Sequence, residues 1–255
     1  MAKTQSALRK YLDATKKETV LLGRIERHLL TLPPDTSRRQ DVLHPSEVTR
    51  DDWCIRQSWF VVRGVRPTHS NPNLRLASIF SEGHAIHAKW QRWAAEIDVL
   101  IGVWSCPDHG NWWGKRSENC VPCEVVYREV PVHQGDLDIA GHADGWLDTG
   151  HLLEIKSVGI GTLRAGGLPI GGGLEQSFRS LNRPLIGHIR QATMYIFCLR
   201  WMHEKGLLEQ VPPDKLLFLY ECKGDQSARE FVVKYDEAYL ADFLDKRAVL
   251  DLDSP

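Results

Sequence analysis

Apolar and polar residues recur along the chain in two periods, which together predict a mixed α/β protein. Spacing of three and four residues predicts helices over 5–30, 47–64, 76–97, 185–204 and 237–250. Short apolar or alternating runs predict strands at 99–104, 124–132, 138–147, 152–156, 216–221 and 230–234. The predicted order is therefore helices, a sheet, a helix, two strands and a last helix.

Breaks in this pattern suggest how the chain is organised. "LPPDTSRRQ" interrupts the first helix, so residues 1–45 are predicted to form an N-terminal helical arm and residues 46–255 a single domain. A glycine-rich stretch at about 158–184 follows the strand at 152–156 directly. It is predicted to be a long mobile loop, because its glycines leave much backbone entropy to be lost on ordering.

Composition and charge restrict the class of protein without identifying a site. With 42% hydrophobic and 25% charged residues in 255, the chain has ordinary globular composition and can bury a core. The net charge of -1 argues against binding nucleic acid through a broad basic surface, so Arg and Lys would have to gather around one groove. No apolar run of membrane-spanning length occurs and the N-terminus is polar, so we expect a cytoplasmic protein.

The segment "GHADGWLDTGHLLEIKS" concentrates acidic and basic side chains on two adjacent predicted strands. Side chains alternate along a strand, so Glu154 and Lys156 share a face and Ile155 points to the opposite layer. If Asp144 lies on the neighbouring strand, two carboxylates converge as Mg²⁺ requires, and the amine can orient water or offset phosphate charge. The alternative is a cross-strand salt bridge at the surface.

Four motifs stand in a fixed order around this segment. "EGHAIH" carries Gly-x-x-x-His on a helix, "GHADGWLD" carries an acidic residue, "EIK" follows, and "HIRQATMY" carries Gln-x-x-x-Tyr. This series resembles the PD-(D/E)xK nucleases, and within them the RecB-like exonucleases, which include CRISPR-adaptation and phage recombination nucleases. The matching residues are Gly83, His87, Asp144, Glu154, Lys156, Gln191 and Tyr195.

The resemblance implies a restriction-endonuclease-like fold, in which helices flank a mixed central sheet. It also implies a metal-dependent DNA exonuclease acting in recombination, repair or phage DNA processing, with a single-strand annealing protein or a helicase as protein partner. Mg²⁺ or Mn²⁺ would be held by His87, Asp144, Glu154 and the Ile155 carbonyl. Lys156 would position the attacking water. Gln191 and Tyr195 would orient the scissile strand or the lysine.

Other residues near the motifs have two interpretations. Arg164, Arg179 and Arg183 in the glycine-rich stretch are expected to contact DNA phosphates, and His188 beside the last motif is a further candidate for DNA contact. Glu129 is either another site carboxylate, as the resemblance suggests, or an exposed strand residue. Without the resemblance, His87 would be a core histidine, and Gln191 and Tyr195 would be helix packing.

A cysteine-rich insert at about 104–124 predicts a second metal site. "CPDHGNWWGKRSENCVPC" pairs Cys106-x-x-His109 with Cys120-x-x-Cys123, a spacing typical of structural Zn²⁺ in a zinc ribbon. Trp104, Trp112 and Trp113 either pack this insert or stack on unpaired bases.

The resemblance offers an iron-sulfur cluster as a rival use of cysteine. Cys54 matches the first cysteine of such a cluster, but the three near the C-terminus are missing, so no cluster is expected. We expect Cys54, Cys198 and Cys222 to be buried thiols.

Two other functions compete with an exonuclease. One is a structure-specific or non-specific endonuclease of the same family. The other is a DNA-binding module, in which the zinc ribbon is the working part and the nuclease-like core is a scaffold. The intact Asp144, Glu154 and Lys156 argue against a scaffold, which would not need all three.

Overall fold

The computed structural model describes residues 21–33, 39, 41–65, 71–119, 123–168 and 170–251. The chain divides into two units: Met1–Asp35 with Thr68–Glu82, and Thr36–Pro67 with Gly83–Pro255. Helices and strands are mixed, as the hydrophobic pattern predicts. Residues 5–20 of the predicted helical arm lie outside the described residues, and the arm boundary at residue 45 stays a prediction.

The smaller unit contains one complete described helix, α2 (Leu22–Thr31), and the start of α5 (Leu74–Glu96). The amide of Asn71 donates to the carbonyl oxygens of Leu30 and Leu32, at 3.0 and 2.7 Å. These bonds satisfy two carbonyls at the C-terminal end of α2, where the helix itself offers no donor.

The larger unit contains a seven-stranded mixed sheet among the described residues, in the order β2-β1-β6-β7-β8-β9, with β3 also paired to β1. Among the described strand pairs of this sheet, only β7 and β8 are parallel, in register from His151 opposite Lys215 to Val158 opposite Cys222. The strands are β1 (Leu100–Cys106), β2 (Gly110–Lys115), β3 (Val126–Tyr127), β6 (Gly145–Leu147), β7 (His151–Val158), β8 (Lys215–Cys222) and β9 (Ala228–Lys234).

A separate two-stranded antiparallel sheet is formed by β4 (Val130–Gln134) and β5 (Ile139–Ala143). The 3-10 turn η2 (Gly135–Leu137) connects them, and the Gln134 side chain caps this turn by accepting from the Leu137 amide at 2.6 Å. Leu43 adds a parallel bridge beside Ile139.

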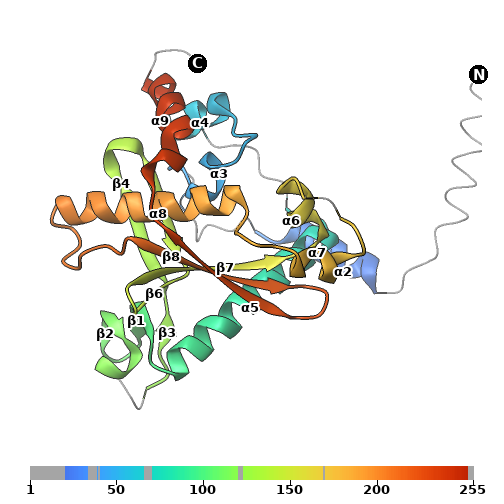
Figure 1. Ribbon diagram of the computed structural model, residues 1–255, viewed down its shortest axis with the longest axis horizontal. Helices are drawn as coiled ribbons and strands as arrows, with labels where there is room; N and C mark the ends of the chain where they lie inside the picture. Colours follow the sequence, from blue (N-terminus) through green and yellow to red (C-terminus); the bar gives the residue numbers. More distant parts are fainter. Residues whose placement is uncertain are drawn as a thin grey trace, which may run out of the picture. The chain divides into compact units, whose positions relative to one another are not determined.

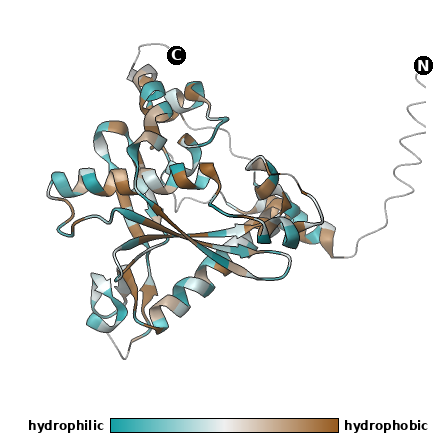
Figure 2. Cartoon of the chain, in the orientation of Figure 1, coloured by the Kyte–Doolittle hydropathy of each residue, from teal (hydrophilic) through white to brown (hydrophobic). Residues whose placement is uncertain are grey.

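Helices cover both faces of the main sheet, as Figure 1 shows for α8 (Ile186–Glu204) and the later part of α5 on either side of β7. Leu152 packs in the cluster that includes Ile196 of α8, whereas Leu153 and Ile155 pack in the cluster that includes Ile86 of α5. The apolar colour runs along the central strands (Figure 2). Neighbours along β7 therefore face opposite layers, so Glu154 and Lys156 share a face and Ile155 points away, as predicted.

The predicted helix over 47–64 is two short helices, α3 (Pro45–Val48) and α4 (Ile55–Val62). The break contains Asp51 and Asp52, whose side chains pair with Arg190 and Arg50. Aspartate favours such local side-chain bonds over a helix interior. The last predicted helix is likewise divided, into η3 (Glu237–Leu240), α9 (Ala241–Arg247) and η4 (Ala248–Asp251).

The glycine-rich stretch at 158–184 is not a loop throughout. It contains α6 (Ile160–Ala165) and α7 (Leu174–Arg179), and it buries Leu163 and Phe178 completely in the core. Burial of two large apolar side chains favours local order despite the glycines, which the composition did not indicate. The predicted mobility of this stretch without DNA stays a prediction.

The insert holds a hairpin that the sequence did not predict, β1 followed by β2, and then the 3-10 turn η1 (Arg116–Glu118). Trp104 is buried, donates to the Gly114 carbonyl oxygen at 3.0 Å and stacks on Trp112, and Trp113 contacts Trp146 edge to face. These tryptophans pack the protein, which is the first of the two predicted uses.

Two of the three expected buried thiols are confirmed. Cys198 and Cys222 are fully buried, whereas Cys54 is exposed, so that expectation was wrong for Cys54. Cys54 lies at the N-cap of α4, where the chain enters the helix from the turn at the surface.

No helix in the described part of the chain combines the length and apolar character needed to cross a membrane.

Candidate active site

Two runs that the sequence predicts as continuous strands are each broken at a carboxylate. The run 124–132 divides at Glu129, whose φ is +64°, and the run 138–147 divides at Asp144. At each break the chain leaves one sheet for the other, since β4 and β5 pair with each other and β3 and β6 pair with β1. Positive φ is costly for a residue with a Cβ, so the Glu129 backbone is held by its surroundings.

Asp144 is held from two sides. Its Oδ1 lies 2.9 Å from Nδ1 of His87 on α5, and its Oδ2 accepts from the Ile155 amide on β7 at 2.6 Å. The Asp144 side chain is only 9% exposed, so these partners replace the water that a buried carboxylate needs. The carboxylate therefore has a fixed position between α5 and β7.

Glu154 and Lys156 begin a chain of contacts that ends on α8. Lys156 Nζ lies 2.6 Å from Glu154 Oε1 and donates to Gln191 Oε1 at 3.0 Å. The Gln191 amide then donates to the Tyr195 hydroxyl at 2.8 Å. Gln191 and Tyr195 are one helical turn apart, which places them on the same face of α8. The two motifs that the sequence places 35 residues apart, at Lys156 and Gln191, are thus in direct contact.

Burial and the charges of neighbouring residues shift the pKa values of Glu154, Lys156 and His87 in opposite directions. Burial raises the pKa of Glu154 above the ordinary carboxyl range, although the charge of Lys156 acts against it. Burial lowers the pKa of Lys156, but the charges of Glu154 and Asp144 more than offset this, so the net shift is upward. For His87, burial also lowers the pKa, and the charge and hydrogen bond of Asp144 raise it overall. The protonated forms of Lys156 and His87 are therefore favoured beside these carboxylates.

Glu129 brings a third donor to Asp144 and His87. One donor atom from each of these residues lies within 4.8 Å of the others, the arrangement a shared cation requires. Burial, then the charge of Asp144, raises the pKa of Glu129.

Gln91 is a site residue that the sequence analysis missed. It donates to Glu129 Oε1 at 3.2 Å and to the Asp144 carbonyl oxygen at 3.0 Å. Its spacing of four residues from His87, on the same helix face, was a usable signal.

With this geometry in place, the chain can be compared with known proteins. Its fold is similar to that of an alkaline exonuclease (LHK-Exo) from Laribacter hongkongensis, with 12% identity over 83% of this chain and 87% of that chain and a TM-score of 0.44. The same enzyme in complex with dAMP gives a TM-score of 0.46, with 12% identity over 83% and 86% of the two chains.

SSO0001 gives a TM-score of 0.40, with 14% identity over 93% of this chain and 89% of that chain. No family model and no curated protein matches the sequence. Membership of the RecB-like branch stays a prediction.

The residues predicted to contact DNA phosphates lie on the segment after β7. Arg164 is in the last turn of α6, Arg179 ends α7, and Arg183 follows α7, all with exposed side chains. Arg179 also pairs with Asp225 at 2.9 Å. Their contact with DNA stays a prediction.

His188, the fourth residue expected to contact DNA, is partly buried. Its Nδ1 is 2.5 Å from the Tyr220 hydroxyl, whose oxygen also accepts from the Leu185 amide at 3.0 Å. Burial, and secondarily the charge of Lys156, lowers the His188 pKa to about 3. The structure thus gives His188 a contact that joins α8 to β8, and a contact with DNA stays a prediction.

Proposed function

We propose that this protein hydrolyses phosphodiester bonds in DNA, as a divalent-metal-dependent exonuclease. The observation that carries the proposal is the convergence of His87, Asp144, Glu154 and Lys156, which we call the carboxylate site. Its members come from α5, the junction of β5 and β6, and β7. His87 contacts Asp144, Lys156 contacts Glu154, and Asp144 accepts from the amide of Ile155, which lies between Glu154 and Lys156 on β7. Two carboxylates, an imidazole and an amine at one place provide the groups that phosphodiester hydrolysis requires.

The donor set suits a hard divalent cation. The separation of 2.9 Å between His87 Nδ1 and Asp144 Oδ1 equals a hydrogen bond. It also equals the separation of about 3 Å expected between adjacent ligands of an octahedral ion bound at about 2.1 Å. Carboxylate oxygens favour Mg²⁺ or Mn²⁺, and the imidazole favours Mn²⁺ of the two. Such a cation, when bound, would neutralise charge on the phosphate and activate water for attack.

The protein's own groups have separate tasks in this proposal. The Ile155 amide fixes one oxygen of Asp144 and leaves the other facing His87. Gln191 holds the Lys156 ammonium beside Glu154, so the lysine is positioned before substrate arrives. Lys156 would orient the attacking water and offset charge on the phosphate, while Gln191 and Tyr195 keep its direction.

DNA would approach along the segment that follows β7. Arg164, Arg179 and Arg183 would bind phosphates, since guanidinium groups pair well with phosphate oxygens. The fold that we propose is a restriction-endonuclease-like core of the RecB-like branch with an N-terminal helical arm. It would act in DNA recombination, repair or phage DNA processing.

The test is digestion of end-labelled linear duplex DNA beside a closed circle, with Mg²⁺, with Mn²⁺ and with chelator. We expect the linear DNA to be shortened from its ends only when a cation is present, and the circle to survive. Glu154→Gln should remove this activity and retain the thermal unfolding transition. Cleavage of the circle would favour an endonuclease, and unchanged cleavage by Glu154→Gln would refute the proposed site.

A further inference from the structure

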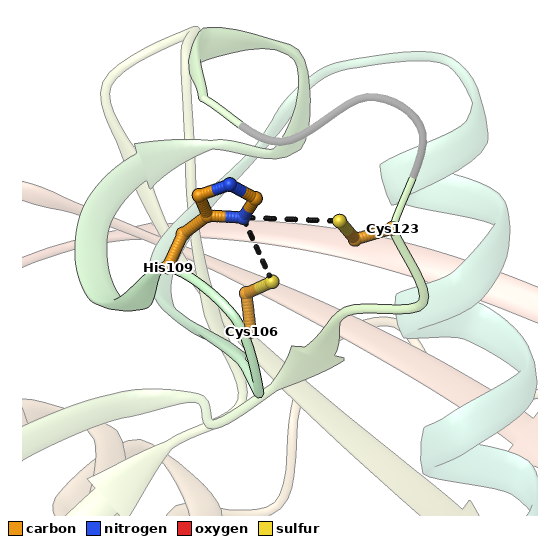
Figure 3. Close-up of side chains that lie close together, drawn as sticks. All are labelled: Cys106, His109 and Cys123. Carbon is orange, nitrogen blue, oxygen red and sulfur yellow. Dashed lines mark hydrogen bonds between the residues drawn. The ribbon is translucent and has the colours of Figure 1, made fainter.

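A second group of possible metal ligands lies at the far end of β1, separate from the carboxylate site. Figure 3 shows the side chains of Cys106, His109 and Cys123 turned toward one another. His109 Nδ1 lies 3.3 Å from Cys106 Sγ and 3.8 Å from Cys123 Sγ, and the three donor atoms are all within 4.8 Å of one another. We call these three residues the cysteine cluster.

Strand pairing explains why the three residues meet. Cys106 is the last residue of β1 and lies opposite Gly110, the first residue of β2, so His109 is in the tight turn between them. Gly110 has φ of +74°, a conformation that glycine adopts without strain. On the other side of β1, β3 pairs through Ser105 opposite Val126, which returns Cys123 to the end of β1.

Hydrogen bonding alone accounts poorly for this arrangement. The Nδ1 atom of His109 has a single lone pair or a single proton, yet two sulfurs approach it. Cys123 Sγ also lies 3.8 Å from Asp108 Oδ2, so an acidic side chain is close to this thiol. A cation among the two sulfurs and the nitrogen would satisfy all of these approaches.

The distances fit a tetrahedral zinc ion. With Zn–S of about 2.3 Å and Zn–N of about 2.0 Å, a sulfur and a nitrogen on one tetrahedral ion are about 3.5 Å apart. The two measured Sγ to Nδ1 distances, 3.3 and 3.8 Å, lie on either side of this value. Two thiolates and an imidazole suit zinc, whereas an iron-sulfur cluster is usually held by four thiolates.

We propose that Cys106, His109 and Cys123 bind one structural zinc ion, independently of any cation at the carboxylate site. Cys120, which the sequence predicts as the fourth ligand, lies outside the described residues. The ion would join the turn between β1 and β2 to the segment that leads into β3.

The position of the cysteine cluster indicates what the ion would stabilise. The segment after β3 stays beside β1 through two bonds, from the Arg128 amide to the Val103 carbonyl oxygen at 2.7 Å and from the Val103 amide to the Glu129 carbonyl oxygen at 2.9 Å. β3 itself is only two residues long. Zinc would hold the chain in place just before this short strand, and would thereby stabilise the backbone that positions Glu129.

Elemental analysis of the full-length protein purified anaerobically tests the proposal. We expect about one zinc ion per chain in the wild type, and less than about a tenth of that in Cys106→Ser and in Cys123→Ser, since each substitution removes a ligand. Cys54→Ser is the matched control, because Cys54 is an exposed cysteine outside the cluster, and it should retain its zinc. Wild-type protein without zinc, with iron instead, or unchanged zinc in Cys123→Ser would each overturn the proposal.

Cobalt substitution in the wild-type protein gives a test that does not depend on whether a variant folds. Co²⁺ bound by two thiolates in tetrahedral geometry should produce intense visible absorption and a thiolate-to-cobalt charge-transfer band. Absence of both bands at stoichiometric Co²⁺ would argue against the site. Glu154→Gln should bind cobalt as the wild type does. Failure of the proposed nuclease would thus leave the zinc result unchanged, and the two proposals are judged separately.

Discussion

The carboxylate site and the cysteine cluster both gather potential metal ligands, but the chain builds them in opposite ways. The carboxylate site draws on α5, β7 and the junction of β5 and β6, and α8 supports it from residues still further along the chain. The cysteine cluster comes from one hairpin and the segment that leads into β3. The first combines oxygen and nitrogen donors with an ammonium group, and the second combines sulfur and nitrogen without one. A site that brings residues far apart in the sequence around an amine is suited to catalysis. A site that brings neighbouring residues together around thiols is suited to a structural metal ion.

Removing the amine is expected to have the largest effect. Lys156→Ala should lower DNA cleavage by at least about 10³-fold, because it removes a positive group from the phosphate and the attacking water. The zinc content should stay at the wild-type level. Single-turnover cleavage of labelled DNA and elemental analysis of the same preparation would measure both effects.

Lys115→Ala provides the matched control. Lys115 pairs with Asp148 at 2.7 Å and is about as exposed as Lys156, at 24% against 19%, yet it lies on β2. Its loss should leave cleavage near the wild-type rate. An equal loss of activity in both variants would mean that Lys156 acts through stability and not through chemistry.

Removing the imidazole should have a smaller effect that depends on the metal. His87→Ala should weaken activation by Mg²⁺ on the order of 100-fold, with partial recovery in excess Mn²⁺. Titration of activity against each cation gives the measurement. His84→Ala, an exposed histidine on the same helix, should behave as the wild type. If His87→Ala instead fails to fold, the residue is a core histidine and the carboxylate site loses a ligand.

Chelation should separate the two sites without any substitution. Brief EDTA treatment should abolish cleavage, and Mg²⁺ alone should restore it to about the original rate while the zinc content stays constant, because closed thiolate sites release zinc reluctantly. Activity and zinc content are followed in the same sample. If restoration required added zinc, the two sites would not be independent.

The smallest effect is expected from a change of pH, which should alter the free energy of unfolding through His188. Its folded pKa of about 3 lies below its ordinary value of 6.5. Between these values the unfolded chain binds a proton that the folded chain does not, so stability decreases as pH falls through this window. From pH 7 to pH 5 the loss should be about 2 kcal/mol, at about 1.4 kcal/mol per pH unit.

His188→Gln should lack this part of the pH dependence. Urea unfolding of both proteins at pH 7 and pH 5 would give the difference. Parallel losses in the two proteins would show that His188 becomes protonated in the folded state.

The comparison of the two sites also explains how much could be predicted. The spacing of Cys106, His109 and Cys123 shows the cysteine cluster within a single stretch of sequence, because a hairpin brings such neighbours together. The carboxylate site has no local signature. Only the resemblance to a family places His87 and Gln191 beside β7, since tertiary packing joins those elements.

Where the hydrophobic pattern misled, tertiary structure had overridden local preference. The runs 124–132 and 138–147 read as single strands, and the chain bends at Glu129 and Asp144 to move between sheets. Conflicts of this kind are typical of functional positions, where local regularity is given up for geometry. The long α-helices and the alternation along β7 were predictable because burial of one face decides them.

The parallel pairing of β7 and β8 affects how the protein is made. β7 carries Glu154 and Lys156, and its parallel neighbour β8 (Lys215–Cys222) is synthesised later. Gln191 on α8, which accepts a hydrogen bond from Lys156, is also synthesised later. At about 5–20 residues per second, the ribosome needs on the order of several seconds to add the intervening chain. During that interval Glu154 has neither its neighbouring strand nor the helix that covers it. A nascent chain of this protein should therefore lack the proposed nuclease activity until α8 and β8 have been synthesised.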